Sequence, residues 1–138
     1  MRILNRLFAA ADRLSAPIPV SAHCDLPCGV YDPAQARIEA EAVRSIQQKY
    51  QESDDPVFKQ RAVRIKEDRA EILKHHLWVL WTDYFKPEHL EMFPNLHDTF
   101  WTTTKMAGEA KKSEDPAQGQ KLLDAVLEIE KMFWETKK

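Results

Sequence analysis

Residues 56–84 read PVFKQRAVRIKEDRAEILKHHLWVLWTDY, a long segment in which apolar residues recur every three to four positions. This spacing predicts one long helix with a single apolar stripe along it. Because the stripe is long and strongly apolar, we expect this helix to be the central one of the fold. The predicted stripe contains Phe58, Ala62, Ile65, Ile72, Leu73, Leu77, Leu80, Trp81 and Tyr84.

The predicted helix starts share an aspartate followed by a proline, at Asp32-Pro33, Asp55-Pro56 and Asp115-Pro116. An aspartate at this place accepts hydrogen bonds from free amides of the first turn, and proline suits the first helical positions. A fourth start lies near Pro87. The four expected helices cover residues 33–50, 56–84, 87–108 and 116–136.

The other three helices also carry apolar faces at helical spacing. The expected inward residues are Ile38, Ala42, Ile46 and Tyr50 in the first helix; Leu90, Phe93, His97, Phe100 and Thr104 in the third; and Leu122, Val126, Ile129 and Phe133, beside Leu123, Leu127, Glu130 and Trp134, in the fourth. Pro94 is expected to bend or split the third helix. Four amphipathic helices on short loops predict an all-α fold, an antiparallel four-helix bundle.

The composition limits the function classes that fit the chain. Its 138 residues suffice for one domain, and its 20 basic and 22 acidic residues leave a net charge of −2. A nearly balanced charge gives no footprint for binding nucleic acid or an anionic membrane. The apolar runs are only a few residues long, far short of the roughly 20 that a membrane-spanning helix needs.

The first 22 residues are predicted to be a cleavable leader. They contain Arg2, Arg6 and a short apolar run at residues 7–11, which superficially resembles a secretory signal. Asp12 and Arg13 end that run after about five residues, where a secretory core needs roughly 7 to 15. We therefore favour a cytoplasmic propeptide over a secretory signal.

Both cysteines of the chain, Cys24 and Cys28, fall within five residues. A disulfide that closes so short a loop stabilises a fold little, so the pair indicates metal or redox chemistry instead. Cleavage after Ala22 would give His23 a free amine. That amine, the Cys24 backbone nitrogen and the two thiolates form a planar set of two nitrogens and two sulfurs, which suits Ni(II) or Cu(II). The His23 imidazole can approach as an axial fifth ligand.

Residues 23–33, HCDLPCGVYDP, resemble the nickel hook of the nickel superoxide dismutases. The resemblance implies a mature four-helix domain over residues 23–138, which is 138 minus 22, or 116, residues, with the hook at 23–31. It implies one nickel ion per subunit, which cycles between Ni(II) and Ni(III) and converts superoxide to oxygen and hydrogen peroxide in antioxidant defence. A homohexamer and a protease that removes the leader are also implied.

The same resemblance gives individual residues a role. His23, Cys24 and Cys28 match the nickel ligands, and Asp25 and Tyr31 match the residues that order the hook and the substrate pocket.

Two charged residues outside the hook match an outer pair of the family. Glu39 and Arg69 correspond to the residues that orient the axial imidazole, although either one alone would more often be a solvated charge. Lys86 is a candidate for local attraction of superoxide, because the net charge of the chain offers no long-range attraction.

Two other function classes use the same residues. A metal-handling protein would bind nickel or copper through the hook without turnover, and a thiol sensor would form a reversible disulfide between Cys24 and Cys28. Other residues that attract attention carry no predicted chemistry. The histidines His75, His76, His89 and His97 are expected to be core or surface residues, and Trp78, Trp81, Trp101 and Trp134 to anchor the core or a subunit interface.

Overall fold

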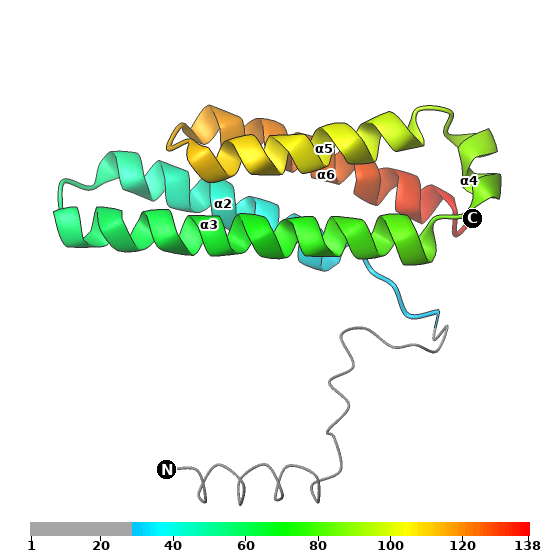
Figure 1. The fold of residues 1–138 in the computed structure, drawn as a ribbon, viewed down its shortest axis with the longest axis horizontal. Coiled ribbons are helices and arrows are strands. Elements are labelled where there is room, and N and C mark those ends of the chain that lie inside the picture. The colour runs from blue at the N-terminus through cyan, green and yellow to red at the C-terminus, as the bar shows by residue number, and fades with distance from the viewer. Residues whose placement is uncertain (1–28) are drawn as a thin grey trace, which may run out of the picture.

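The computed structural model describes residues 29–138, which contain helices and no strands. The helices in chain order are α2 (Ala34–Glu52), α3 (Pro56–Val79), α4 (Pro87–Met92), α5 (Leu96–Lys112) and α6 (Pro116–Glu135). The four long helices lie side by side, and the short α4 lies at the end of the bundle where the chain also ends (Figure 1). Each long helix packs against the next long helix, and α6 packs back against α2. The predicted four-helix bundle is therefore confirmed.

The three Asp-Pro pairs begin helices as the sequence predicts. In each pair the aspartate Oδ1 accepts a hydrogen bond from the amide two residues later, at 2.8 to 2.9 Å. The three donor–acceptor pairs are Ala34 with Asp32, Val57 with Asp55, and Ala117 with Asp115. Each bond satisfies one of the amides that a helix start leaves without a partner inside the helix.

The central helix ends in a π-helical turn, Leu80–Tyr84, instead of continuing as an α-helix to Tyr84. Its buried stripe also differs from the expected one. Phe58 and Ile65 are exposed, whereas Lys66 is buried. The buried positions of α3 and its π-helical turn are Ala62, Lys66, Ala70, Leu73, Leu77, Leu80 and Tyr84. Apolar character alone thus misassigned the first half of the stripe, where small alanines and a paired lysine face the neighbouring helices.

The buried face of α2 is not the predicted one. Ile38 is 47% exposed, and the other three expected core residues are only half-buried. The residues that face the bundle are Ala36, Glu39, Ala40, Val43 and Gln47. The small alanines allow the neighbouring helices to approach closely, and the two polar side chains find hydrogen-bond partners across the interface.

Pro94 splits the third predicted helix into α4 and α5, as expected. The α5 helix then continues to Lys112, beyond the predicted end at Gly108. The prediction that His97 points inward was wrong, since it is exposed while its neighbour Leu96 is fully buried. In α6 the first predicted row, Leu122, Val126, Ile129 and Phe133, is buried. Of the second row, Leu123 is buried, whereas Leu127 and Trp134 are exposed.

Polar side chains tie the loop between α5 and α6 to the rest of the bundle. The Lys66 side chain is fully buried, and its Nζ donates to the Ser113 carbonyl at 2.7 Å and to Glu114 Oε1 at 2.8 Å. Gln47 donates from α2 to the same Ser113 carbonyl at 2.9 Å, and Gln51 donates to the Glu114 carbonyl at 2.7 Å. The loop is therefore held by both α2 and α3.

Helix α6 approaches α2 closely at Gly119. A Cβ atom there would lie 2.2 Å from Gln47 Oε1 and 2.7 Å from the Arg44 Cα atom. Neither distance leaves room for a side chain, so the close contact requires glycine. Within residues 29–138, no helix is both long and apolar enough to cross a membrane.

Replacing Lys66 by alanine should lower the free energy of unfolding by about 2 to 4 kcal/mol, because the change leaves a cavity and removes the cation that Glu114 pairs with and one of the two donors to the Ser113 carbonyl. Lys111→Ala is the matched control, since Lys111 also joins α5 to α3, through Glu71 at 3.0 Å. Its hydrogen bond lowers the pKa of Glu71, but the pair is exposed, so its loss should lower the free energy of unfolding much less than the loss of Lys66. Urea unfolding of both variants measures the difference. Equal losses of unfolding free energy in the two variants would contradict a stabilising role for the buried Lys66 interactions.

Candidate metal centre and substrate pocket

The predicted nickel ligands His23, Cys24 and Cys28, together with Asp25, lie outside the described residues. The described chain begins at Gly29, whose φ of +70° is a conformation that favours glycine. It then passes Tyr31 and enters α2 after the Asp32 cap. The residues around this segment therefore show which part of the bundle adjoins the predicted hook.

Tyr31 lies in a pocket of about 400 Å³ at the end of the bundle where α4 is found. The pocket is assembled from segments far apart in the sequence: the segment before α2, the π-helical turn, α4 and the residues after α6. Its lining residues are Gly29, Tyr31, Asp83, Tyr84, Lys86, His89, Thr136 and Lys137. The segment that follows the hook thus forms one wall of a polar cavity.

Tyr84 is the central side chain of this pocket. Its ring lies 5.6 Å from the Tyr31 ring and 4.3 Å from the Phe133 ring, between centroids. The His89 ring stacks on it at 5.8 Å, and Lys86 holds His89 by donating its amide hydrogen to Nδ1 at 3.1 Å. Packing on several sides leaves the Tyr84 ring little freedom, so its hydroxyl has a defined place in the pocket.

Glu39 and Arg69 form the ion pair that the sequence comparison with the family suggested. The Glu39 side chain is buried, with the residue 2% exposed, and both of its carboxylate oxygens lie 3.4 Å from Arg69 Nη1. Gln35 donates to Glu39 Oε1 at 2.7 Å. The structure thus brings α2 and α3 together through a buried carboxylate, about one and a half turns after the start of α2.

A profile of the nickel-containing superoxide dismutases matches residues 18–137. This match spans the predicted hook and almost all of the helical bundle.

The chain belongs to the nickel-containing superoxide dismutases.

Relatives support the assignment at both the sequence and the structure level. The superoxide dismutases [Ni] of Streptomyces coelicolor and Streptomyces seoulensis are each 58% identical over 136 residues, which is 99% of this chain and 99% of each relative. A native nickel superoxide dismutase structure superposes with a TM-score of 0.81 at 61% identity, over 84% of this chain and 100% of that chain. This nickel superoxide dismutase is therefore an oxidoreductase that converts superoxide to oxygen and hydrogen peroxide and uses nickel as its cofactor.

Three other solved structures of nickel superoxide dismutase that match this chain are single-residue variants. They replace a histidine at the first position of the chain, an aspartate at the third and a tyrosine at the ninth. Their TM-scores to this chain are 0.77, 0.80 and 0.81.

The histidines outside the hook are distributed over the bundle. Within residues 29–138, no group of three histidine, cysteine, aspartate or glutamate side chains lies close enough to hold a metal. His75 and His76 are neighbours on α3, with rings 5.8 Å apart, while His97 packs against Trp81 at 4.6 Å. His89 alone among them lines the pocket of Tyr31.

Sequence reasoning missed several residues of this dismutase's pocket. Tyr84 was assigned only to the apolar stripe of α3, His89 only to the core or surface, and Thr136 and Lys137 to no role. Lys86 was selected for its charge alone, and it does line the pocket. No local pattern marks Tyr84, His89, Thr136 or Lys137, because the pocket forms only when residues 29–31, 83–89 and 136–137 come together in the fold.

Arg69→Ala should lower the free energy of unfolding by about 1 to 2 kcal/mol, because it leaves the buried Glu39 carboxylate without its cation. This expected loss is at the low end for removing one partner of a buried ion pair, because the Arg69 side chain is 43% exposed. In the double variant with Glu39→Gln, Arg69→Ala should cost less, and a double-mutant cycle by urea unfolding measures that coupling. Additive effects would show that the two side chains do not interact.

Proposed function

We propose that residues 1–22 are a leader removed after Ala22, and that residues 23–138 are the mature enzyme with one nickel ion held by the hook at 23–31. One observation carries this proposal. The native solved chain is matched over its full length, yet it covers 84% of the 138 residues here, which is about 116, the number of residues from 23 to 138. The Streptomyces relatives, in contrast, match 99% of this chain.

The positions replaced in the solved variants also support a mature chain that starts at His23. When residues are counted from His23, the first, third and ninth are His23, Asp25 and Tyr31. The solved variants of nickel superoxide dismutase replace the same residue types, histidine, aspartate and tyrosine, at their first, third and ninth positions. The agreement supports His23 as the N-terminal residue of the mature chain and supports a functional role for Asp25 and Tyr31.

The donors offered by the hook fit nickel. In the mature chain, the His23 amine, the Cys24 backbone nitrogen and the Cys24 and Cys28 thiolates would hold the nickel ion, and the thiolates would stabilise its higher oxidation state. Nickel bound there supplies the one-electron cycle between Ni(II) and Ni(III). Glu39 would orient the His23 imidazole by accepting its N–H, because a buried carboxylate held by Arg69 and Gln35 is a preorganised acceptor.

Tyr31 and Asp25 would control the access of superoxide to this site. The Tyr31 ring lies against Tyr84 at the wall of the pocket, where a small anion can be positioned beside the hook. Lys86 lines the same pocket and adds a positive charge. Since the net charge of the chain is only −2, local cations are the main means of attracting an anionic substrate.

We place the enzyme in the cytoplasm, with a processing protease as its maturation partner. The leader's apolar run at residues 7–11 is too short for a secretory core. A reducing compartment also keeps Cys24 and Cys28 available as metal ligands instead of as a disulfide.

The masking of the site by the leader can be tested by comparing the full chain with a form that begins at His23. While Ala22 is attached, the His23 nitrogen is an amide and one planar donor is missing. After loading with nickel, the full chain should remove superoxide at least about 100-fold more slowly, a loss at the upper end of that caused by outer-shell changes alone. Stopped-flow decay of superoxide and nickel analysis provide the measurement.

Two controls define the result. Cys28→Ser in the His23-starting form should lose nickel and activity together, because it removes one of the thiolates. Equal activity of the full and processed chains would contradict the masking, and an active Cys28→Ser variant would contradict the ligand assignment. A processed chain that holds nickel without turnover would behave as a metal-handling protein.

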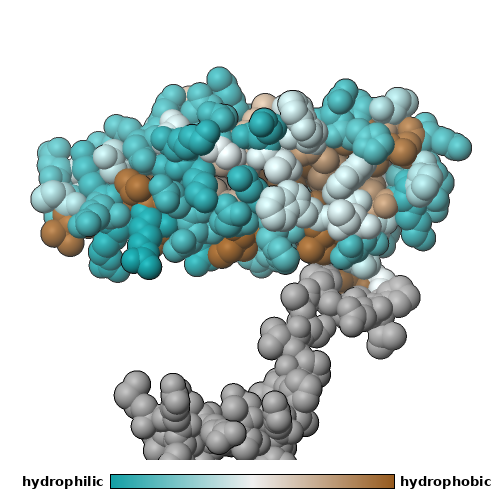
Figure 2. Space-filling view, viewed as in Figure 1, coloured by the Kyte–Doolittle hydropathy of each residue, from teal (hydrophilic) through white to brown (hydrophobic). Residues whose placement is uncertain are grey.

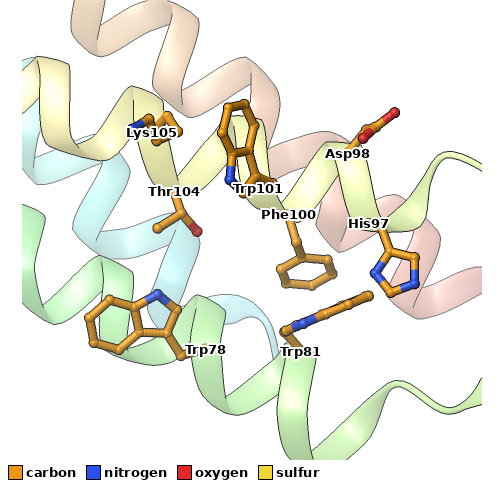
Figure 3. A pocket seen from close by; sticks show the side chains of 8 residues that line it. All are labelled: Trp78, Trp81, His97, Asp98, Phe100, Trp101, Thr104 and Lys105. Carbon is orange, nitrogen blue, oxygen red and sulfur yellow. The ribbon is translucent and has the colours of Figure 1, made fainter.

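We further propose that the enzyme assembles as a homohexamer in which exposed aromatic side chains make subunit contacts. Apolar and pale aromatic side chains gather over the half of α3 and α5 nearer to α4 (Figure 2). There a groove of about 670 Å³ lies between the two helices, with Trp78 and Trp81 on one side and Phe100 and Trp101 on the other (Figure 3). Trp101 is 67% exposed and Trp78 is 47% exposed. Such large exposed aromatic side chains favour an interface.

Trp101→Glu should dissociate the assembly, because a buried interface tryptophan typically contributes 2 kcal/mol or more, about a 30-fold change in the dissociation constant. Thr102→Glu is the matched control, since it adds the same charge at the next, also exposed, position of α5. Analytical ultracentrifugation measures both. A monomeric parent enzyme would refute the hexamer, and a Trp101→Glu hexamer would place its contacts elsewhere.

A further inference from the structure

The C-terminal turn is held against the pocket of Tyr31. After α6 ends at Glu135, the Thr136 amide donates to the carbonyls of Met132 and Phe133, both at 3.2 Å. The Lys137 amide donates to the Trp134 carbonyl at 3.3 Å. These bonds fold the turn back onto α6, so Thr136 and Lys137 become part of the pocket wall.

The hydroxyl of Thr136 joins this turn to Tyr84 by a hydrogen bond, which we call the latch. Thr136 Oγ1 lies 2.6 Å from the Phe133 carbonyl, which can only accept, so Thr136 donates its single hydroxyl hydrogen there. Tyr84 Oη lies 2.5 Å from the same Oγ1 and must therefore be the donor in that second bond. The Tyr84 hydroxyl hydrogen points at Thr136, and both hydroxyls take part in one directed chain of hydrogen bonds.

Lys137, the next residue of the turn, places its ammonium group over two aromatic rings. Lys137 Nζ lies 4.8 Å from the centroid of the Tyr84 ring and 5.3 Å from that of Phe133, within range of a cation–π interaction with both rings. Lys86 is a second cation of the pocket, and Asp83 is its acidic side chain. Two ammonium groups against one carboxylate leave this pocket net positive on a chain that is net negative overall.

We propose that Lys137 attracts superoxide into the pocket, and that the Tyr84–Thr136 hydrogen bond is the latch that holds Lys137 in place. This inference rests on the proposed function, because it takes the pocket of Tyr31 as the route to the hook. Lys137 thus acts as a cation that draws the anionic substrate, and Thr136 acts as a positioning residue through the turn that carries both.

Lys137→Gln and Lys121→Gln form a matched pair for the test. Both remove one positive charge from the chain, but Lys121 is an exposed residue near the start of α6, at the other end of that helix. In the nickel-loaded mature enzyme, Lys137→Gln should lower kcat/KM for superoxide about three- to tenfold at low ionic strength. The difference should vanish as salt screens the charge, and Lys121→Gln should follow the parent enzyme throughout.

The positioning role of Thr136 is tested with two substitutions of similar size. Thr136→Val removes the hydroxyl and should reduce the salt dependence of kcat/KM toward that of Lys137→Gln, whereas Thr136→Ser keeps the hydroxyl and should restore it. A merely structural contribution of Thr136 would change the melting temperature without changing the salt dependence. Equal salt dependence of the valine and serine variants would therefore show that the Thr136–Tyr84 hydrogen bond does not position Lys137.

Binding of azide separates this inference from the proposed function. Azide is a small monovalent anion that mimics the charge of superoxide, and calorimetry measures its binding without turnover. Lys137→Gln should weaken azide binding, and Lys121→Gln should not. Equal binding and equal salt dependence in the two variants would overturn the role of Lys137. If the mature parent enzyme did not remove superoxide, the proposed function itself would be wrong, regardless of the azide-binding result.

Discussion

The hydrogen bond from the Ala34 amide to the Asp32 carboxylate is the constraint on which the site depends. It lies at the start of α2, directly after residues 23–33, which match the nickel hook of the family in sequence. Gly29, with its positive φ, lies three residues before Asp32. The helix start then fixes Glu39 at a set distance along α2, where Arg69 meets it from α3. One short stretch of sequence, residues 23–33, therefore contains both the predicted nickel ligands and the aspartate that begins α2.

The two ends of the bundle are stabilised by different interactions. Away from the hook, Lys66 and Gln47 bind the carbonyls of the loop between α5 and α6, and Gly119 lets α6 approach α2 closely. At the hook end, stacked aromatic rings surround Tyr84 and leave a polar cavity beside them. Hydrogen-bonded polar side chains hold the first end together, while the second leaves an open cavity beside Tyr84.

The sequence predicted the helices well because their starts have local chemical causes. Asp55-Pro56 begins a helix through a bond two residues away, and Pro94 breaks one by lacking an amide hydrogen. Burial was predicted less well, because it depends on what lies opposite. Ile38 and Ile65 read as core residues but are exposed, whereas Lys66 reads as surface and is buried. The pocket around Tyr84 joins segments over 100 residues apart, and no local pattern could indicate it.

The position of the last residues has a practical consequence for handling the protein. Thr136 and Lys137 belong to the wall of the pocket, so a purification tag fused after Lys138 would emerge beside that pocket. A tag ahead of Met1 would instead leave with the leader if the chain is processed after Ala22. The loop between α2 and α3, residues 53–55, lies at the opposite end of the bundle and offers an insertion point that leaves both the hook and the C-terminal turn untouched (Figure 1).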